Sequence, residues 1–158
     1  MVLIKFIDQQ FAELHRRSID LLMDLAAERL YWEPEPVGPS ARAFSCGESL
    51  VRSARAVERT FGGLTANLWD DPFEWTLPET LRTPADVIEY FGEVEATRCR
   101  GFALFRDDGD LARAIALAPD EFKPLGELLL DTWARAAHWQ GRAFAVHSLF
   151  AVTVPPHI

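Results

Sequence analysis

The stretch that decides the fold runs from Ser45 to Leu64 and reads SCGESLVRSARAVERTFGGL. Its first four residues match a capping box, in which the Ser45 hydroxyl accepts an early amide N–H of the helix and the Glu48 side chain reaches back to the cap. From Leu50 on, apolar or small residues recur every three or four positions, which is typical of a helix with one buried face. That face consists of Leu50, Ser53 or Ala54, Val57, Phe61 and Leu64.

Three further segments carry the same spacing. In the segment nearest the N-terminus, Ser18 occupies the one polar position of an otherwise apolar stripe. Thr83, Pro84 and Asp86 form a strong helix start, because threonine caps, proline suits the first turn and the acid faces the positive end of the helix dipole. The predicted helices cover residues 3–29, 45–67, 84–105 and 123–150.

Four long helices with one apolar stripe each favour an all-α four-helix bundle. The segment from Leu111 to Leu117 is compatible with a short extra helix between the third and the fourth, and we expect no paired strands. The tail from Val152 through Pro156 cannot continue the last helix. The length of 158 residues predicts a single domain over residues 1–158.

The composition limits the classes of function. The chain has 16 Lys and Arg against 24 Asp and Glu, a net charge of -8, which is the wrong sign for neutralising nucleic-acid phosphates. We therefore expect no nucleic-acid partner. No stretch approaches the roughly 18 apolar residues of a membrane span, so we expect a soluble protein. Cys46 and Cys99 are too few and too far apart for a disulfide framework or a thiolate zinc site, which favours the reducing cytoplasm.

Four short motifs follow one another along the chain. They are Leu30-Tyr31-Trp32-Glu33-Pro34, Phe44-Ser45 with Leu50 and Glu58, Thr83-Pro84-Ala85-Asp86, and Ala137-His138-Trp139-Gln140-Gly141-Arg142. In this order the chain resembles the DinB-like (YfiT-like) family of helical bundles over nearly its whole length. Members of that family commonly bind a divalent metal through three histidines, and several are transferases or isomerases that act with a low-molecular-weight thiol. A divalent metal or such a thiol is implied as a cofactor by the resemblance alone.

The metal-ligand positions of the family can be carried over residue by residue. Aligned on Gly141, the two positions in the last helix fall on Arg135 and Trp139. The position in the second helix falls on Arg52 when counted from the helix start, and on Ser53 when the inward stripe is followed. None of these is a histidine. The resemblance therefore implies a degenerate member, and we predict no metal site and no resident cofactor.

Arg135 is the most informative of these positions. If its side chain points into the bundle, its charge needs a negative partner. That partner is either a carboxylate, such as Asp131 one turn away or a Glu on a neighbouring helix, or a bound anion. Trp139, one turn further on, lies close enough for the guanidinium to cover its indole ring.

The other candidates each have a structural alternative. Arg52 either lines the site or forms a solvated ion pair with Glu48, and Trp139 is either a platform for a ligand or part of the core. His138 either joins the site or packs at the surface. Cys46 lies in the first turn of the second helix, where the helix dipole can lower a thiol pKa, although a small residue at a helix start explains it equally well.

Three functions follow from these residues. The first is a bundle whose central pocket either binds a small anionic ligand or is filled by Arg135 and Trp139. The second is a thiol-dependent transferase or isomerase of the DinB-like family, without metal or with one held by unexpected ligands such as His138 and Glu58. The third is a homodimeric interaction module that uses the aromatic loop residues Trp69, Phe73 and Trp75. The predicted ligand-binding residues are Arg52, Ser53, Arg135, His138 and Trp139.

Overall fold

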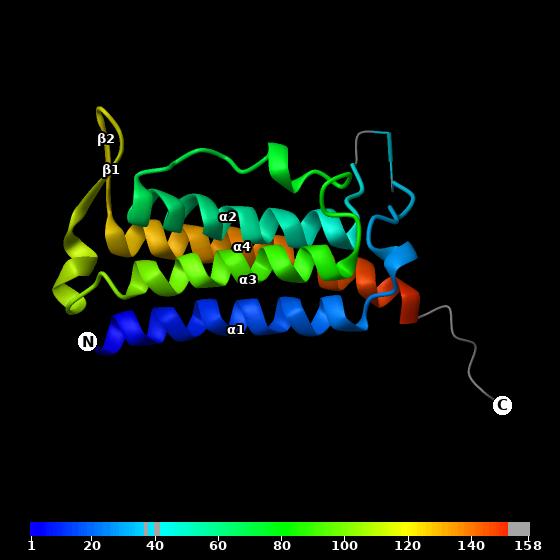
Figure 1. Cartoon of the computed structure of the whole chain (residues 1–158), viewed down its shortest axis with the longest axis horizontal. Helices are drawn as coiled ribbons and strands as arrows, with labels where there is room; N and C mark the ends of the chain where they lie inside the picture. The colour runs from blue at the N-terminus through cyan, green and yellow to red at the C-terminus, as the bar shows by residue number, and fades with distance from the viewer. Residues whose placement is uncertain (37, 40–41, 152–158) are drawn as a thin grey trace.

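Four long helices make up most of the computed structural model, which describes residues 1–36, 38–39 and 42–151 (Figure 1). The helices are α1 (Val2–Asp24), α2 (Cys46–Ala66), α3 (Pro84–Phe102) and α4 (Leu125–Ala151). The prediction of a four-helix, mostly helical fold is confirmed. The predicted non-helical tail from Val152 onward lies outside the described residues. Within those residues, no helix has the length and apolar character that crossing a membrane requires.

The helices form a ring in the order α1, α3, α2, α4. In Figure 1, α1 and α4 run in one direction while α2 and α3 run in the other. Helix α1 therefore lies diagonally across the bundle from α2. Because α2 and α3 are parallel neighbours, the segment that joins them, residues 67–83, has to return along the whole length of α2, and it includes a 3-10 turn at Glu74–Thr76 (Figure 1).

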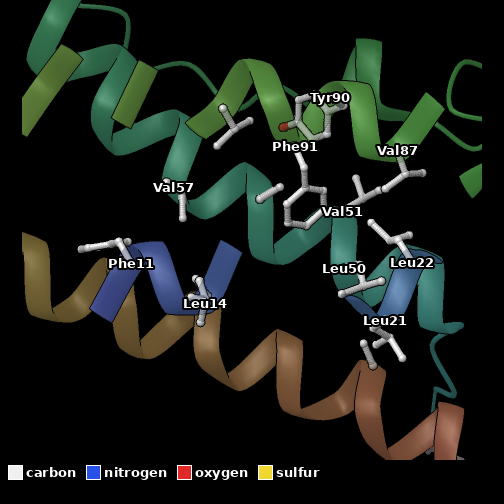
Figure 2. Packing of buried hydrophobic residues seen from close by; sticks show 14 of the residues in the cluster. Phe11, Leu14, Leu21, Leu22, Leu50, Val51, Val57, Val87, Tyr90 and Phe91 are labelled. Carbon is white, nitrogen blue, oxygen red and sulfur yellow. The ribbon is translucent and has the colours of Figure 1, made fainter. Parts of the chain in front are cut away.

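The core occupies the space where the apolar stripes of the helices meet, and Figure 2 shows Phe11, Leu14, Val57 and Phe91 within it. Phe11 of α1 and Phe61 of α2 meet across the diagonal, edge to face, with 5.4 Å between ring centroids. Both rings are almost completely buried. Each buried side chain of this size stabilises the fold by about 1.5–3 kcal/mol, so the stripes predicted from the sequence provide the main stabilisation.

Ser18, the polar residue in the stripe of α1, has a buried partner on α4. The Gln140 amide donates hydrogen bonds from Nε2 to the Ser18 hydroxyl, at 2.8 Å, and to the Leu14 carbonyl, at 2.6 Å. Both Ser18 and Gln140 are buried. Since an unpaired polar group in this position would be costly, the pair fixes the register of α4 against α1.

The helix starts predicted at Ser45 and Thr83 are confirmed, with one correction, whereas the last helix begins at Leu125 and not at residue 123. Thr83 and Asp86 form a complete capping box, because each side chain accepts the backbone N–H of the other residue. Ser45 accepts the Glu48 amide at 3.0 Å, but the expected return contact from the Glu48 side chain is wrong. That carboxylate accepts from Arg52 instead, at 3.1 Å. Helix α1 also ends earlier than predicted, because Leu25 is extended at φ -90 and ψ 123.

The connection between α3 and α4 corrects two expectations. In place of the short helix expected over Leu111–Leu117, a 3-10 helix at Asp108–Ala112 is followed by an antiparallel hairpin. The strands are β1 (Ala114–Ala118) and β2 (Glu121–Pro124), so the expectation of no paired strands is wrong. Ile115 and Leu117 are the partly buried residues of β1 and alternate with exposed alanines, which is the period of a strand. The hairpin stands beyond the C-terminal end of α2 (Figure 1).

Asp108 caps α1 from this connection. Its carboxylate accepts the backbone N–H groups of Val2, at 2.8 Å, and Ile4, at 3.0 Å. These hydrogen bonds, chiefly that from Ile4, lower the pKa of Asp108 to about 2. A carboxylate with a lowered pKa stabilises the fold above its ordinary pKa, and this contribution is lost as the pH falls towards the lowered value.

We therefore expect Asp108→Asn to lower the melting temperature at pH 7, with a smaller difference from wild type at pH 2. Thermal melts followed by circular dichroism at both pH values measure this. Asp107→Asn, which alters a neighbouring acid that bonds the Gly109 amide, is the matched control. An equal loss at both pH values would contradict a role for the Asp108 charge.

Candidate functional site

A groove between α2 and α4 contains most of the predicted site residues. It consists of two adjoining hollows of about 410 Å³ and 150 Å³, and Ala56, Arg59 and Arg135 line both. The larger one extends to the hairpin, and its lining also includes Thr60, Trp69, Leu117, Ala118, Glu121, Lys123, Leu128, Asp131 and Thr132. The smaller one is also lined by Arg52, Arg55, Asp71 and Trp139. Its volume places the larger hollow in the range of small-molecule sites.

The floor of the groove is held by polar contacts between α2 and α4. The Thr60 and Thr132 hydroxyls are 2.7 Å apart and share a hydrogen bond. Further along, Ser53 donates from Oγ to the Ala136 carbonyl at 2.8 Å. All four residues are buried. The small side chains let the two helices approach closely, so the long side chains on either side of this contact form the walls of the groove.

The α2 wall carries Arg52, Arg55 and Arg59, whose spacing places them on one helix face. Arg52 pairs with Glu48 at 3.1 Å, which confirms the ion pair considered from the sequence. Arg55 donates from Nε and Nη2 to a carboxylate oxygen of Asp71, at 3.0 and 2.5 Å. The pair of Arg55 with Asp71 connects the returning segment to α2. The charges of Arg52 and Arg55 are therefore both largely neutralised.

Arg59 and Arg135 differ from these two arginines. Arg59 donates from Nε to the Trp69 carbonyl at 3.0 Å, and within the described part of the chain neither Arg59 nor Arg135 pairs with a carboxylate. Both side chains are exposed. The groove therefore has two guanidinium groups, one from each helix, whose charge no described acid neutralises.

The structure answers the question that the sequence leaves open for Arg135. Its side chain does not point into the bundle, and Asp131, the partner considered from the sequence, instead accepts from Lys123 Nζ at 2.5 Å. Lys123 belongs to the hairpin and also pairs with Glu127 at 3.5 Å. The acid expected to neutralise Arg135 thus fastens the hairpin to α4.

Trp139 lies at the edge of the groove, partly buried. Its ring meets Phe44 edge to face, with 5.1 Å between centroids. The guanidinium groups of Arg52 and Arg142 lie 4.9 and 5.1 Å from the Trp139 ring centre, so these two arginines cover the ring in place of Arg135, which the sequence analysis considered. His138 is exposed, with its ring centroid 5.7 Å from that of Trp139.

The centre of the bundle offers no room for a ligand near Ser53. Ser53 is fully buried and its hydroxyl is used by the Ala136 carbonyl, so of the two alternatives only Arg52 lines the groove. The hollow beside Ser53 measures only about 20 Å³, close to the size of one water. The central space is filled by core side chains such as Phe11 and Phe61, and not by Arg135 and Trp139.

A divalent metal does not fit the positions carried over from the DinB-like family. Arginine and tryptophan offer no lone pair to a metal, and the Ser53 hydroxyl is already engaged. Glu58 accepts a hydrogen bond from Tyr90 on α3, away from His138, and burial raises its pKa despite that bond. Within the part of the chain that the structure describes, no cluster of three His, Cys, Asp or Glu side chains could hold a metal ion.

The Cys46 thiol is not activated. The side chain is completely buried, and burial raises the pKa of Cys46 to about 12. The thiol is therefore protonated at neutral pH, and the interpretation of Cys46 as a packing residue at the helix start is the one that fits.

Of the aromatic loop residues, Phe73 and Trp75 are each 52% exposed. Trp69 is partly buried and lines the larger hollow. The loop therefore separates into a half-exposed pair and a residue that belongs to the groove.

No family model, curated protein or solved structure matches the chain. The site therefore has to be interpreted from its own geometry. Sequence reasoning identified Arg52, Arg135 and Trp139 but missed Arg59 and the hairpin wall. The spacing of Arg59 from Arg52 and Arg55, which places the three arginines on one helix face, is the signal that could have found it.

Proposed function

We propose that the chain binds a small anionic ligand in the groove between α2 and α4. The observation that carries this proposal is the pair Arg59 and Arg135, which reach the same groove from two helices without a carboxylate partner among the described residues. A guanidinium group binds a carboxylate or phosphate through two parallel N–H donors, so two such groups provide a recognition site for an anion.

The overall charge of the chain makes this local arrangement distinctive. With a net charge of -8, the molecule as a whole repels anions. An anion is therefore attracted only where cations are concentrated and their own acids are engaged elsewhere. Because Arg59 and Arg135 are exposed, added salt screens the attraction, and the proposed affinity falls as ionic strength rises.

We also propose that the chain is a DinB-like bundle that lacks the family metal. The four-helix arrangement supports this relationship, and the residues at the ligand positions support the loss of the metal. On this proposal, arginines on the groove walls bind an anion in place of a metal-centred reaction site.

The proposal predicts that carboxylates and phosphates stabilise the wild-type protein against heat and bind it in calorimetric titrations. Arg59→Gln and Arg135→Gln should each weaken binding about tenfold, because each removes charged hydrogen bonds to the anion. Both residues are exposed, so the unliganded variants should melt close to wild type.

Arg82→Gln is the matched control for these variants. Arg82 is also exposed and also donates from Nε to a backbone carbonyl, that of Glu79 at 2.7 Å, but it lies outside the groove. Equal weakening by Arg82→Gln, or the absence of any anion-dependent stabilisation of wild type, would refute anion binding in the groove.

A further inference from the structure

Trp69 is held in a fixed position beside Arg59. Its indole ring lies against Gly63 of α2, so closely that a Cβ on Gly63 would come within 2.2 Å of a ring atom. The indole Nε1 donates to the Asn67 side chain at 3.1 Å, and Asn67 adopts a left-handed conformation with φ 55 at the end of α2. Since the Trp69 carbonyl accepts from Arg59, the same turn orients a flat ring and a guanidinium group together.

The surroundings of this ring are partly apolar. The lining of the larger hollow includes Leu128 from α4, Leu117 from β1 and the small side chains of Ala56 and Ala118. One part of the indole packs on Gly63, and the residue as a whole is only partly buried and lines the hollow. The hollow therefore offers a flat aromatic surface and aliphatic contacts next to the cations.

The charged residues that line the groove favour a ligand with one negative charge over a ligand with two. Lys123 is neutralised by Asp131 and Glu127, so its charge is not available to a ligand. Arg59 and Arg135 remain, but Glu121 of the hairpin lines the same hollow. The lining of this hollow has three cations, Arg59, Lys123 and Arg135, and two acids, Glu121 and Asp131, so one monoanion balances its net charge and a dianion exceeds it.

We infer that the ligand of this groove is a planar aromatic monocarboxylate, with its carboxylate on Arg59 and Arg135 and its ring against Trp69. This inference rests on the proposed function and narrows it to one class of ligand. Offset or edge-to-face contact between two aromatic rings adds affinity beyond the burial of apolar area, which an aliphatic acid does not obtain.

The test compares four probes by calorimetric titration of the full chain: 2-naphthoate, cyclohexanecarboxylate, the uncharged 2-naphthamide and the dianionic 2-naphthyl phosphate. We expect 2-naphthoate to bind at least about fivefold more tightly than cyclohexanecarboxylate, and more tightly than the phosphate. The uncharged amide should bind at least about tenfold more weakly than 2-naphthoate, because it does not pair with the arginines.

Trp69→Leu should remove the preference for 2-naphthoate while leaving cyclohexanecarboxylate binding within about twofold of wild type. Trp69→Phe retains an aromatic ring and should keep part of the preference for 2-naphthoate. It replaces the leucine variant in the test if that variant does not fold. Trp75→Leu is the matched control, because Trp75 lies on the same loop but not among the residues that line the groove.

The outcomes separate this inference from the proposed function. Equal binding of the two carboxylates, an equal effect of Trp69→Leu on both, or tighter binding of the phosphate would overturn the inference while anion binding in the groove stands. If none of the three anions binds, the proposed function itself is wrong.

Discussion

Replacing Arg98 with alanine is expected to lower the free energy of unfolding by about 2 kcal/mol, because it removes a buried guanidinium that pairs with two partly exposed acids. Arg98 is 4% exposed and lies on α3. Its guanidinium donates to both carboxylate oxygens of Glu95, at 2.6 and 2.7 Å, and to the carboxylate of Asp8 on α1. The variant leaves a cavity between the two helices and deprives two acids of their shared cation.

Urea or guanidinium denaturation of wild type and variant measures this loss. Arg100→Ala is the control, since Arg100 is exposed on the same helix and donates to the Thr97 hydroxyl. It should change stability by less than about 0.5 kcal/mol. A loss for Arg98→Ala no larger than that of the control would show that the network does not stabilise the fold.

The same network has a pH dependence. Burial alone would raise the pKa of Glu95, but the hydrogen bonds and charge of Arg98 leave it below its ordinary value. Stability from a carboxylate with a lowered pKa is present above its unfolded pKa and is lost as the pH falls through the folded one. The difference between wild type and Arg98→Ala should therefore shrink at acid pH.

Replacing either of two glycines of α3 with alanine is expected to change the stability of the protein, in opposite directions for the two positions. A Cβ on Gly101 would lie 2.4 Å from a ring carbon of Phe61, whereas a Cβ on Gly92 would have no atom within 4 Å. Phe61 is fully buried against Phe11 and Phe102 and has little freedom to move. Overpacking of a core in this way costs about 1–3 kcal/mol.

Gly101→Ala should therefore destabilise the protein, while Gly92→Ala should stabilise it by about 0.5–1 kcal/mol through reduced backbone freedom of the unfolded chain. Denaturant midpoints of the two variants, measured side by side, give the comparison. A stabilising Gly101→Ala would mean that the Phe61 ring can shift, and that the contact between α2 and α3 is looser than the structure shows.

The sequence predicted the helices because their buried stripes are long and regular. Even Ser18, the exception in the first stripe, was correctly placed inside, although its partner Gln140 was not identified. The periodicity of the last helix already indicates the orientation of Arg135. Thr132 and Ala136 face inward, so the side chain of Arg135 points toward the edge of the helix contact. Alignment on the family motif left that orientation open.

The hairpin was missed because its residues do not look like a strand. Residues 114–118 read AIALA, and counting alanine as apolar hides the alternation of Ile115 and Leu117 with smaller side chains. Alanine and leucine also favour helices. The groove could not be predicted for a related reason: it needs the ring order of the helices, which short motifs do not encode, and the hairpin that forms its end wall.

The position of α1 between α3 and α4 also determines when the four-helix bundle can be completed during synthesis. Asp8 meets Arg98 across 90 residues of chain, and the Leu14 carbonyl meets Gln140 across 126. Helix α1 is made before the other three helices, yet the side of α1 that packs on α4 stays in water until the last helix has been made. A nascent chain that ends before residue 125 therefore leaves the sides of α1 and α2 that pack on α4 uncovered, and chaperones can bind to that surface.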